Sequence, residues 1–318
     1  MRLLRIVFLV AGVAVLGWLV VRFGAGAVAA SLAQVAWWQF VLICLVYGLS
    51  MAVDTLGWRY AFASDRVPLR RLFAARVAGE AVNVLTAMAS VGGEAVKAWL
   101  VRRDVPYEES VPSVIVAKTA ITVAQMLLLV AGITLAVTVV SIDSRLLKGM
   151  LALLLIEALA VGGFLATQVT GLVARAGRLL TAFGVAQAGM YGGRLDEALR
   201  SYYRRQWRRC LISVGWHFVG WLFSVAEAAL ILMVIGVPAS FAMAMVIEAF
   251  GSGVRFITFL VPASLGALEG ANVAVFPALG FSASAGLVFS LLRRARQAVW
   301  IGTGIVMLVV MRLRPPRD

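Results

Sequence analysis

The chain has 318 residues, of which 62% are hydrophobic and only 14% are charged, and its mean hydropathy is +0.96. These values exclude an ordinary soluble globular protein, in which about a quarter of the residues are charged. The net charge of +14 does not indicate nucleic-acid binding, because the basic residues gather in loops between apolar runs, as in cytoplasmic loops beside anionic lipids.

Apolar runs of about 20 residues, the length that crosses a bilayer, recur along the chain. They are too long and alternate too little to be membrane barrel strands of ~10 residues. The sequence predicts full spans at roughly 4–23, 38–62, 111–140, 146–168, 211–236 and 284–311. The first run follows two arginines but lacks a small-residue cleavage site, so we expect a retained helix. The predicted fold is an all-α polytopic membrane protein in one transmembrane domain, 1–318.

Two further apolar regions, 72–103 and 241–280, are each interrupted near the middle. The interruptions are Ser90-Val91-Gly92-Gly93-Glu94 and, after a break at Pro262, Ser264-Leu265-Gly266-Ala267-Leu268-Glu269. Two half-helices that meet at an irregular turn satisfy both sequences, provided that the turn is buried in protein or lines a cavity. We expect two broken re-entrant hairpins. Two thin spans in each region remain an alternative, and they leave all later connections on the same side of the membrane.

The two motifs also indicate an internal repeat. A basic residue follows each motif glutamate at a distance of 24 residues, Lys118 after Glu94 and Arg293 after Glu269. The repeat units are then about 38–140 and 211–311.

Charge sets the expected orientation of these units. The connections 24–37, 237–240 and 277–284 are uncharged, which places them outside. The arginines assigned to the cytoplasmic side are Arg2, Arg5, Arg59, Arg66, Arg70, Arg71, Arg76, Arg102, Arg103, Arg312, Arg314 and Arg317. Both termini are then cytoplasmic and the two units are inverted. An inverted repeat with discontinuous helices is typical of transporters, whose site lies where the repeats meet.

The basic segment 170–210 is too polar to span the membrane. Its end places Leu195, Leu199, Tyr202 and Gln206 along one stripe among arginines, which predicts a cytoplasmic amphipathic helix lying on an anionic membrane surface. A topogenic anchor is the favoured role for this connector, and lipid capture stays open.

Charged residues inside apolar sequence are the candidates for a polar site, because a carboxylate in a membrane segment costs roughly 2.5 kcal/mol or more. Asp54, Glu157, Glu227 and Glu248 are such residues. The residues predicted to bind substrate are Glu94, Glu269, Lys118, Arg293, Arg294, Glu80, Asn83 and Arg255.

The arginines of the last span allow two interpretations. The planar fork of Arg293, Arg294 or Arg296 suits the phosphate oxygens of an anionic headgroup. Internal neutralisation by Glu248, Glu269 or Glu227 is the alternative. Glu80 and Arg255 each lie 14 residues before a motif glutamate, so an ion pair between the repeats is a further suggestion.

We expect neither a cofactor nor a metal site. There is one histidine, His217, interpreted as a residue of the bundle interior or of the membrane interface in preference to a proton relay, and Cys44 and Cys210 do not indicate a disulfide framework. The sequence has no G-x-S-x-G, H-E-x-x-H or G-x-x-x-x-G-K-[ST] motif. These features argue against most enzymes and against transport driven by ATP within this chain.

Three runs in combination resemble a known family: Gly79-Glu80-Ala81-Val82-Asn83, Gly92-Gly93-Glu94-Ala95-Val96-Lys97, and the run from Pro262 to Glu269. They look like the lysylphosphatidylglycerol synthase transmembrane region, a flippase-like family that includes the membrane half of the multiple peptide resistance factor. The resemblance covers nearly the whole chain. It implies that Glu94 and Glu269 are paired motif acids, followed by Lys118, where an arginine is expected, and by Arg293 or Arg294. The chain reaches Asp318 directly after its last span, so we expect the synthase domain to be missing.

The leading hypothesis is a lipid flippase of the cell inner membrane, which passes a phospholipid or lipid-linked headgroup through a polar site between inverted repeats. Its substrate is expected to be anionic or to contain phosphate, and a lipid-synthesis enzyme is a candidate partner. The resemblance also implies links to hopanoid and polyprenyl-linked glycolipid pathways, so the lipid stays open. The alternatives are an intramembrane lipid-modifying enzyme with Glu94 or Glu269 as base, and a non-catalytic accessory protein of an envelope-lipid pathway.

Overall fold

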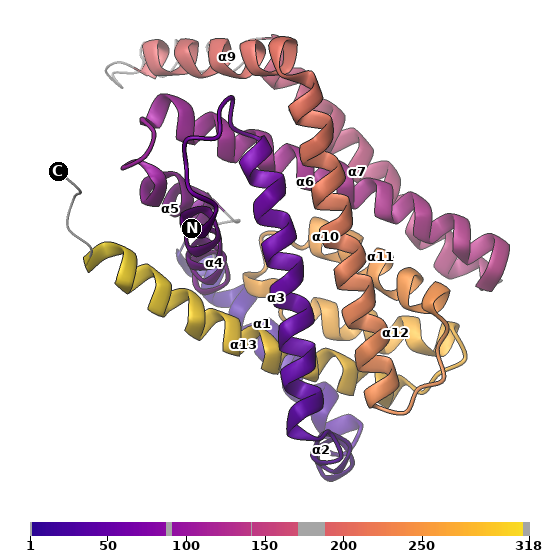
Figure 1. Ribbon diagram of the computed structural model, residues 1–318. Coiled ribbons are helices and arrows are strands. Elements are labelled where there is room, and N and C mark those ends of the chain that lie inside the picture. The colour runs from indigo at the N-terminus through magenta and orange to yellow at the C-terminus, as the bar shows by residue number, and fades with distance from the viewer. Residues whose placement is uncertain (1, 87–90, 141, 171–187, 314–318) are drawn as a thin grey trace.

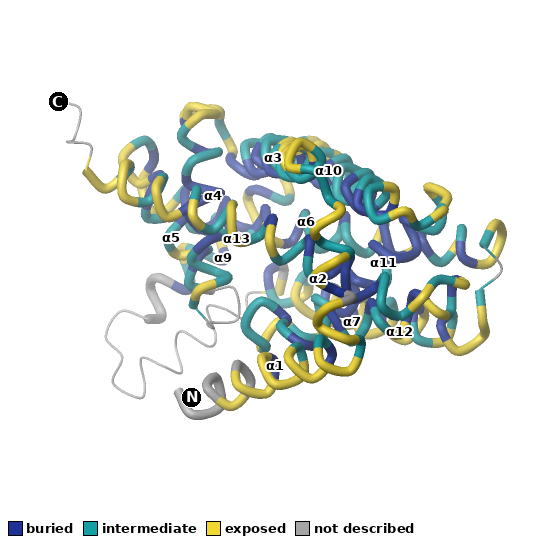
Figure 2. The backbone as a smooth tube through the Cα atoms, turned by 90° about the horizontal axis from the view of Figure 1, so that it is seen from below, coloured by how far each residue is buried: buried dark blue, intermediate teal, exposed yellow. Residues whose placement is uncertain are grey.

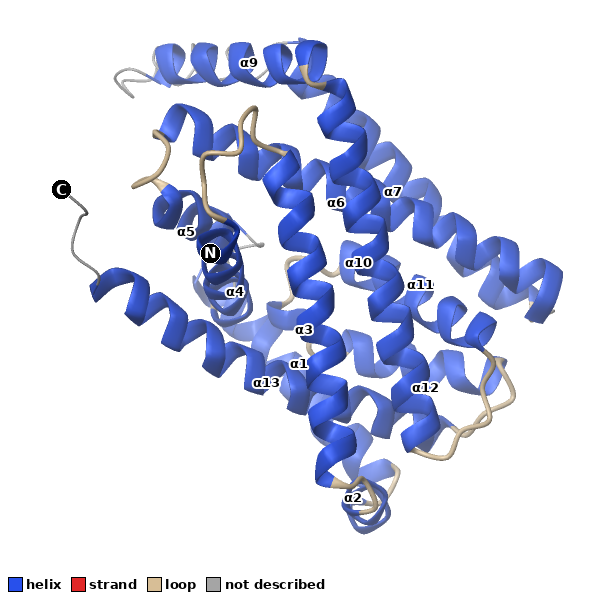
Figure 3. Ribbon diagram, viewed as in Figure 1, coloured by secondary structure: helices blue, strands red, loops and turns tan. Residues whose placement is uncertain are grey.

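Every regular element of the described residues is a helix (Figure 3). The computed structural model describes residues 2–86, 91–140, 142–170 and 188–313. Ser90 of the first motif, residues 171–187 of the connector and the tail arginines Arg314 and Arg317 lie outside these ranges. The elements are α1 (Arg2–Arg22), α2 (Ala25–Ala33), α3 (Trp37–Tyr60), α4 (Leu69–Leu85), α5 (Val91–Val101), α6 (Tyr107–Leu135), the π-helical continuation η1 (Ala136–Val140), α7 (Ser144–Thr170), α9 (Ala188–Arg205), α10 (Trp207–Val234), α11 (Phe241–Ile257), the 3-10 turn η2 (Pro262–Ser264), α12 (Ala267–Ala278) and α13 (Ala283–Leu313).

Five of these helices are long and apolar enough to cross a membrane: α3, α6 with η1, α7, α10 and α13. They correspond to five of the six expected spans and confirm a polytopic all-α fold. The sixth expected span coincides with α1, of which Val10–Arg22 counts as a shorter apolar helix. The following connection, expected as a loop over 24–37, is largely helical because the alanine-rich stretch Ala25–Ala33 forms α2. Alanine is the best helix former, and this stretch has no proline to stop it.

The two interrupted regions are broken helices, as predicted. The 17-residue α4 and the 11-residue α5 flank residues 86–90, and the 17-residue α11 and the 12-residue α12 flank η2. At about 1.5 Å per residue, all four are shorter than the ~30 Å hydrocarbon core. The motif glutamates lie in the first turns of α5 and α12, and not in the breaks themselves. In the second break Gly266 has φ +78°, a left-handed conformation that glycine adopts without strain.

Helix packing follows one scheme in both halves of the chain. In sequence order, α3, α4, α5 and α6 correspond to α10, α11, α12 and α13. The two first helices, α3 and α10, pack side by side (Figure 1). The first helix of each hairpin packs on the long helix of the other half, α4 on α13 and α11 on α6. The halves therefore interlock, and the polar hairpins lie at their boundary.

The buried side chains form two clusters at opposite ends of the long helices. One joins the C-terminal end of α3 to α9 and includes Trp58, Phe62, Leu199 and Tyr202, while the other includes Ile43, Leu128 and Phe289. The exposed Trp37 begins α3, and the exposed Trp207 begins α10. Because these two helices are antiparallel, the tryptophans mark opposite ends, where membrane interfaces favour aromatic rings.

The amphipathic helix of the connector lies across one end of the long helices (Figure 1). Its apolar stripe was expected to rest on lipid, but Leu199 and Tyr202 are buried against the protein. The Tyr202 hydroxyl donates to the carbonyl of Tyr60 at 2.6 Å, and the Tyr203 hydroxyl donates to Gln168 at 2.6 Å. Burial raises the pKa of Tyr203 to about 12, so this hydroxyl keeps its proton. The sequence stripe predicted burial correctly but not the surface that provides it.

The outer faces of the long helices are apolar, whereas the buried positions gather between them (Figure 2). Exposed leucines line α3 and α7, and exposed valines line α13. Such a continuous apolar exterior fits a lipid environment.

Candidate functional site

A cavity of about 940 Å³ lies between the two halves and is lined by both. Within the part of the chain that the structure describes, its acidic lining residues are Asp54, Glu80, Glu227, Glu248 and Glu269. Its basic lining residues, under the same limit, are Arg76, Lys118, Arg255, Arg293, Arg294 and Arg296. Charges of both signs in an otherwise apolar bundle are expensive, which is characteristic of a substrate or ion pathway.

The second hairpin is tied to the last helix by one arginine. Arg294 donates from Nε to Glu269 Oε1 at 2.6 Å and from Nη1 to the carbonyl of Ala263 at 2.9 Å. The other oxygen of Glu269 accepts the backbone N–H of Gly266 at 2.7 Å, which caps α12. Glu269 is 1% exposed. One ion pair therefore fixes both the break and the start of α12 on α13.

The neighbouring arginines of α13 are neutralised inside the protein. Arg293 Nη2 lies 2.6 Å from Glu248 Oε2, and Arg296 Nε lies 2.9 Å from Glu227 Oε1. Arg255 also pairs with Glu248, at 2.6 Å. Internal neutralisation, one of the two interpretations of these arginines, is thus the arrangement found. The suggested ion pair between Glu80 and Arg255 is wrong, because Arg255 takes the nearer Glu248 on its own helix face.

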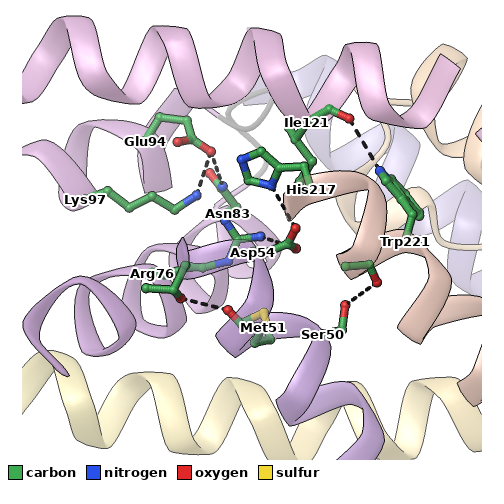
Figure 4. A network of polar contacts seen from close by, with 12 residues as sticks. Ser50, Met51, Asp54, Arg76, Asn83, Glu94, Lys97, Ile121, His217 and Trp221 are labelled. Atoms are coloured by element: carbon green, nitrogen blue, oxygen red, sulfur yellow. Dashed lines mark hydrogen bonds and ion pairs between the residues drawn. The ribbon is translucent and has the colours of Figure 1, made fainter. Parts of the chain in front are cut away.

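The first hairpin has different contacts. Glu94 pairs with Lys97 on its own helix at 2.9 Å and accepts Asn83 Nδ2 at 3.3 Å (Figure 4). Asn83 Oδ1 accepts the backbone N–H of Gly93 at 2.7 Å, which joins α4 to α5. The helices cross so closely that a Cβ on Gly93 would overlap the carbonyl of Gly79. Glu94 is thus held behind the cavity wall, and Asn83 is the residue of this group that faces the cavity.

Two charged residues of the cavity have no ion pair among the described residues. Lys118 is exposed on α6 and Glu80 is half-buried on α4, and both line the cavity. Every other charged lining residue within the described ranges has an oppositely charged partner. Seven of the eight predicted substrate-binding residues line this one cavity, and Glu94 is the eighth.

A third polar group joins α3 to α10. Asp54 contacts Arg76 Nη2 through Oδ2 at 2.6 Å and His217 Nδ1 through Oδ1 at 2.8 Å (Figure 4). His217 is fully buried, so its interpretation as a residue of the bundle interior is confirmed. Arg76, grouped from the sequence with the arginines of the cytoplasmic side, is buried in α4. Its position within an apolar run after Arg70 and Arg71 was the signal that distinguished it from them.

Hydrogen bonds flank the Asp54–His217 contact on both sides. Ser50 Oγ donates to the carbonyl of Gly220 at 2.9 Å, and Ser213 Oγ donates to the carbonyl of Gly57 at 2.8 Å. The residues of α10 repeat those of α3 at a constant offset of 163 residues: Ser213 corresponds to Ser50, His217 to Asp54, and Gly220 to Gly57. The two helices therefore present the same pattern, Ser-x3-Asp/His-x2-Gly, to each other in antiparallel register. We call this set of six residues the seam. Sequence reasoning missed it.

The comparisons with known proteins give one match. The model of the family described as the lysylphosphatidylglycerol synthase transmembrane region matches residues 3–305. No curated protein and no solved structure matches the chain significantly. The matched range contains both hairpins, the seam and every charged residue that lines the cavity. The chain belongs to the family of the lysylphosphatidylglycerol synthase transmembrane region.

Proposed function

We propose that this protein moves a phospholipid or lipid-linked headgroup between the leaflets of the cell membrane. The family relates to membrane proteins that modify or handle lipids. The observation that carries the proposal is the cavity between the two halves, which Lys118 and Glu80 line without an ion pair to any described residue. A headgroup that carries a phosphate supplies the anion that Lys118 lacks, and charge-assisted contacts of this kind are the strong ones.

The bound headgroup lies in the cavity while its acyl chains stay in the surrounding lipid. The phosphate contacts Lys118 first and then competes with the glutamates for Arg293 and Arg294. A cationic or hydroxylated part of the headgroup contacts Glu80 and Asn83. Glu94 acts through Asn83, which it holds in place, and Arg255 positions Glu248. This assignment gives each of the predicted substrate-binding residues a role.

Movement between leaflets uses the repeat. The antiparallel seam and the interlocking hairpins support an arrangement in which units 38–140 and 211–311 are related by an inverted two-fold axis. In an inverted repeat, the conformation of one half is adopted by the other when the site opens to the opposite side. The second hairpin is here clamped by Arg294, and the first is not clamped by Lys118. In the opposite state, Lys118 clamps Glu94 and Arg294 is released.

The orientation follows from charge. Arginines cluster at the end of the molecule where α9 lies, and we assign this end to the cytoplasm together with both termini. The protein is then a multi-pass protein of the inner membrane.

The test is a leaflet assay in vesicles of phosphatidylethanolamine and phosphatidylglycerol that contain traces of a fluorescent, headgroup-intact phosphatidylglycerol. A membrane-impermeant quencher reports the fraction of probe in the outer leaflet over time. We expect protein-containing vesicles to exchange the probe faster than protein-free vesicles, and Lys118→Ala vesicles to lose most of the gain. Lys148→Ala, an exposed lysine at the start of α7, is the matched control. Equal rates with and without protein, for this lipid and for lipids found bound to it, contradict the proposal.

Native mass spectrometry of the protein in mild detergent identifies the lipid to test. We expect a retained phosphate-containing lipid that Lys118→Ala loses. A new lipid species that accumulates with time in the vesicles would instead indicate an intramembrane enzyme.

A further inference from the structure

The seam contains a buried histidine whose second ring nitrogen has no partner. His217 Nδ1 contacts Asp54 Oδ1 at 2.8 Å, while His217 Nε2 is buried and lacks a hydrogen bond within the described residues. Asp54 is also the acceptor for Arg76, at 2.6 Å. A carboxylate that faces a guanidinium only accepts hydrogen bonds, so the imidazole hydrogen lies on Nδ1. Nε2 is then unprotonated, and its lone pair is buried among protein atoms.

The surroundings hold this ring tightly. A Cβ on Gly57 would overlap the imidazole, and a Cβ on Gly220 would overlap Asp54. The two glycines of the repeated pattern are therefore what allows α3 and α10 to approach closely enough for the contact. A proton on Nε2 would need an acceptor, and the described residues provide none for this atom.

The charges around the ring oppose a further positive charge. Asp54 on α3 is already matched by Arg76 on α4, and Lys97 on α5 is a further positive charge that acts on the ring. On α6, which also packs on α10, the charged residue of the cavity wall is Lys118. The next charged residue along α10 is Glu227, which belongs to the arginine cluster of α11 and α13.

We propose that His217 is a proton-binding site whose occupancy is linked to separation of α3 and α10. Nε2 takes a proton from water only when the seam opens, and no other bond is made or broken. Because a ligand shifts an equilibrium towards the state that binds it better, a proton on Nε2 favours the opened seam. The site lies where the 163-residue repeat brings the two halves together, so opening it separates the halves.

The site can be tested without any lipid movement, because His217 is the only histidine in the chain. Protein labelled with ¹⁵N-histidine and purified through a tag without histidine gives one pair of ring nitrogen signals. We expect the neutral Nδ1–H tautomer at about pH 8 and reversible conversion to the doubly protonated ring as the pH falls to about 5. A neutral ring that persists to about pH 5, or one that is already doubly protonated at about pH 8, overturns the proposal.

The link to the seam is tested by Ser213→Ala, which removes a neighbouring hydrogen bond and changes no titratable group. A looser seam should admit the proton more easily, so conversion should occur at higher pH than in the wild type. Thr303→Ala, on the exposed face of α13, is the control and should leave the conversion unchanged. An identical conversion in the wild type and Ser213→Ala overturns the linkage.

A second arm rests on the proposed function. In the vesicle assay, we expect a pH difference across the membrane to change the wild-type translocation rate several-fold and to have no effect on His217→Gln. A pH response that is the same in both proteins overturns the role of this proton in transport. If no protein moves lipid at all, the proposed function fails while the histidine signals still decide whether the site binds a proton.

Discussion

The two broken hairpins have matching sequences but different ion pairs. In the second hairpin, Glu269 is 1% exposed and is clamped by Arg294 from the long helix α13. In the first, the side chain of Glu94 is 20% exposed and pairs with Lys97 on the same short helix, while Lys118 of the long helix has no ion pair among the described residues. Lys118 and Arg294 occupy equivalent positions in the two halves, because each is the twelfth residue of its long helix.

A sequence repeat therefore need not produce a symmetric structure. One half has an ion pair between its hairpin and its long helix, and in the described residues of the other half the motif glutamate pairs within its own short helix instead. For a protein with inverted repeats, such an asymmetry is the expected form of one end state, and the mirror arrangement is the other. Substitutions of Glu269, Glu94 and Lys118 should therefore differ in their effect on the free energy of unfolding.

Glu269→Gln should have the largest effect. It leaves Arg294 without its anion in a buried site, and breaking a buried pair in this way costs about 3–5 kcal/mol. Thermal unfolding in detergent measures the loss, and the vesicle assay should show a translocation rate reduced about tenfold or more, which corresponds to ~1.4 kcal/mol or more. The control is Glu197→Gln on the exposed face of α9. The double variant Glu269→Gln, Arg294→Gln should recover part of the stability, and no recovery would contradict the clamp.

Glu94→Gln should have a smaller effect. The Glu94 side chain is 20% exposed, and Gln keeps an acceptor for Asn83 and for the Lys97 ammonium, so the expected loss is about 1 kcal/mol of unfolding free energy. Translocation should still fall, because the mirror state needs the charge of Glu94 to bind Lys118. If Glu94→Gln destabilises the protein as much as Glu269→Gln, the two motif glutamates contribute equally to stability, which contradicts the difference between their ion pairs.

Lys118→Ala should change the free energy of unfolding by less than about 0.5 kcal/mol, because Lys118 is exposed and has no ion pair among the described residues. Its effect should appear in translocation, where losing one phosphate contact lowers the rate about tenfold. Unfolding and leaflet exchange are measured on the same preparation. A clear loss of stability together with normal translocation would show that Lys118 is structural.

Lys118→Arg should have the smallest effect on stability and sharpens the comparison most. The planar fork of arginine reaches a carboxylate with two donors, so the first hairpin becomes more like the second. We expect a gain of a few tenths of a kcal/mol, in the range of a partly exposed pair, and translocation slowed about twofold because the mirror state becomes too stable. Faster translocation than in the wild type would argue that the pair is not formed in the cycle.

Much of the fold could be predicted because hydrophobic length and helix breakers act locally. The long spans follow from the cost of burying polar groups in lipid, and the breaks follow from glycine, serine and Pro262. The choice of ion partner could not be predicted in this way. Whether Glu94 meets Lys97 or Lys118 depends on the rotation of α5 against α6, which the sequence spacing of 24 residues does not set.

The other incorrect or missed predictions share a cause: a sequence pattern can indicate that a residue is buried without indicating which surface covers it. The stripe of α9 is the same whether lipid or protein covers Leu199. Arg76 was grouped with the arginines of the cytoplasmic side because it follows Arg70 and Arg71, although about one more helical turn takes it into the bundle. The repeated Ser-x3-Asp/His-x2-Gly pattern was present in the sequence, but its meaning depends on antiparallel contact between α3 and α10.

Pulsed electron resonance between spin labels across each hairpin would detect the exchange of ion pairs itself. Labels at the exposed positions Ala95 and Leu127 report the first hairpin against α6, and labels at Ala274 and Val299 report the second against α13, with both native cysteines replaced. In lipid, we expect two label-to-label distances for each pair. Lys118→Arg should shift the populations of both pairs towards the state in which the first hairpin is clamped. A single distance for each pair, unchanged by Lys118→Arg and by bound lipid, would contradict the exchange of ion pairs.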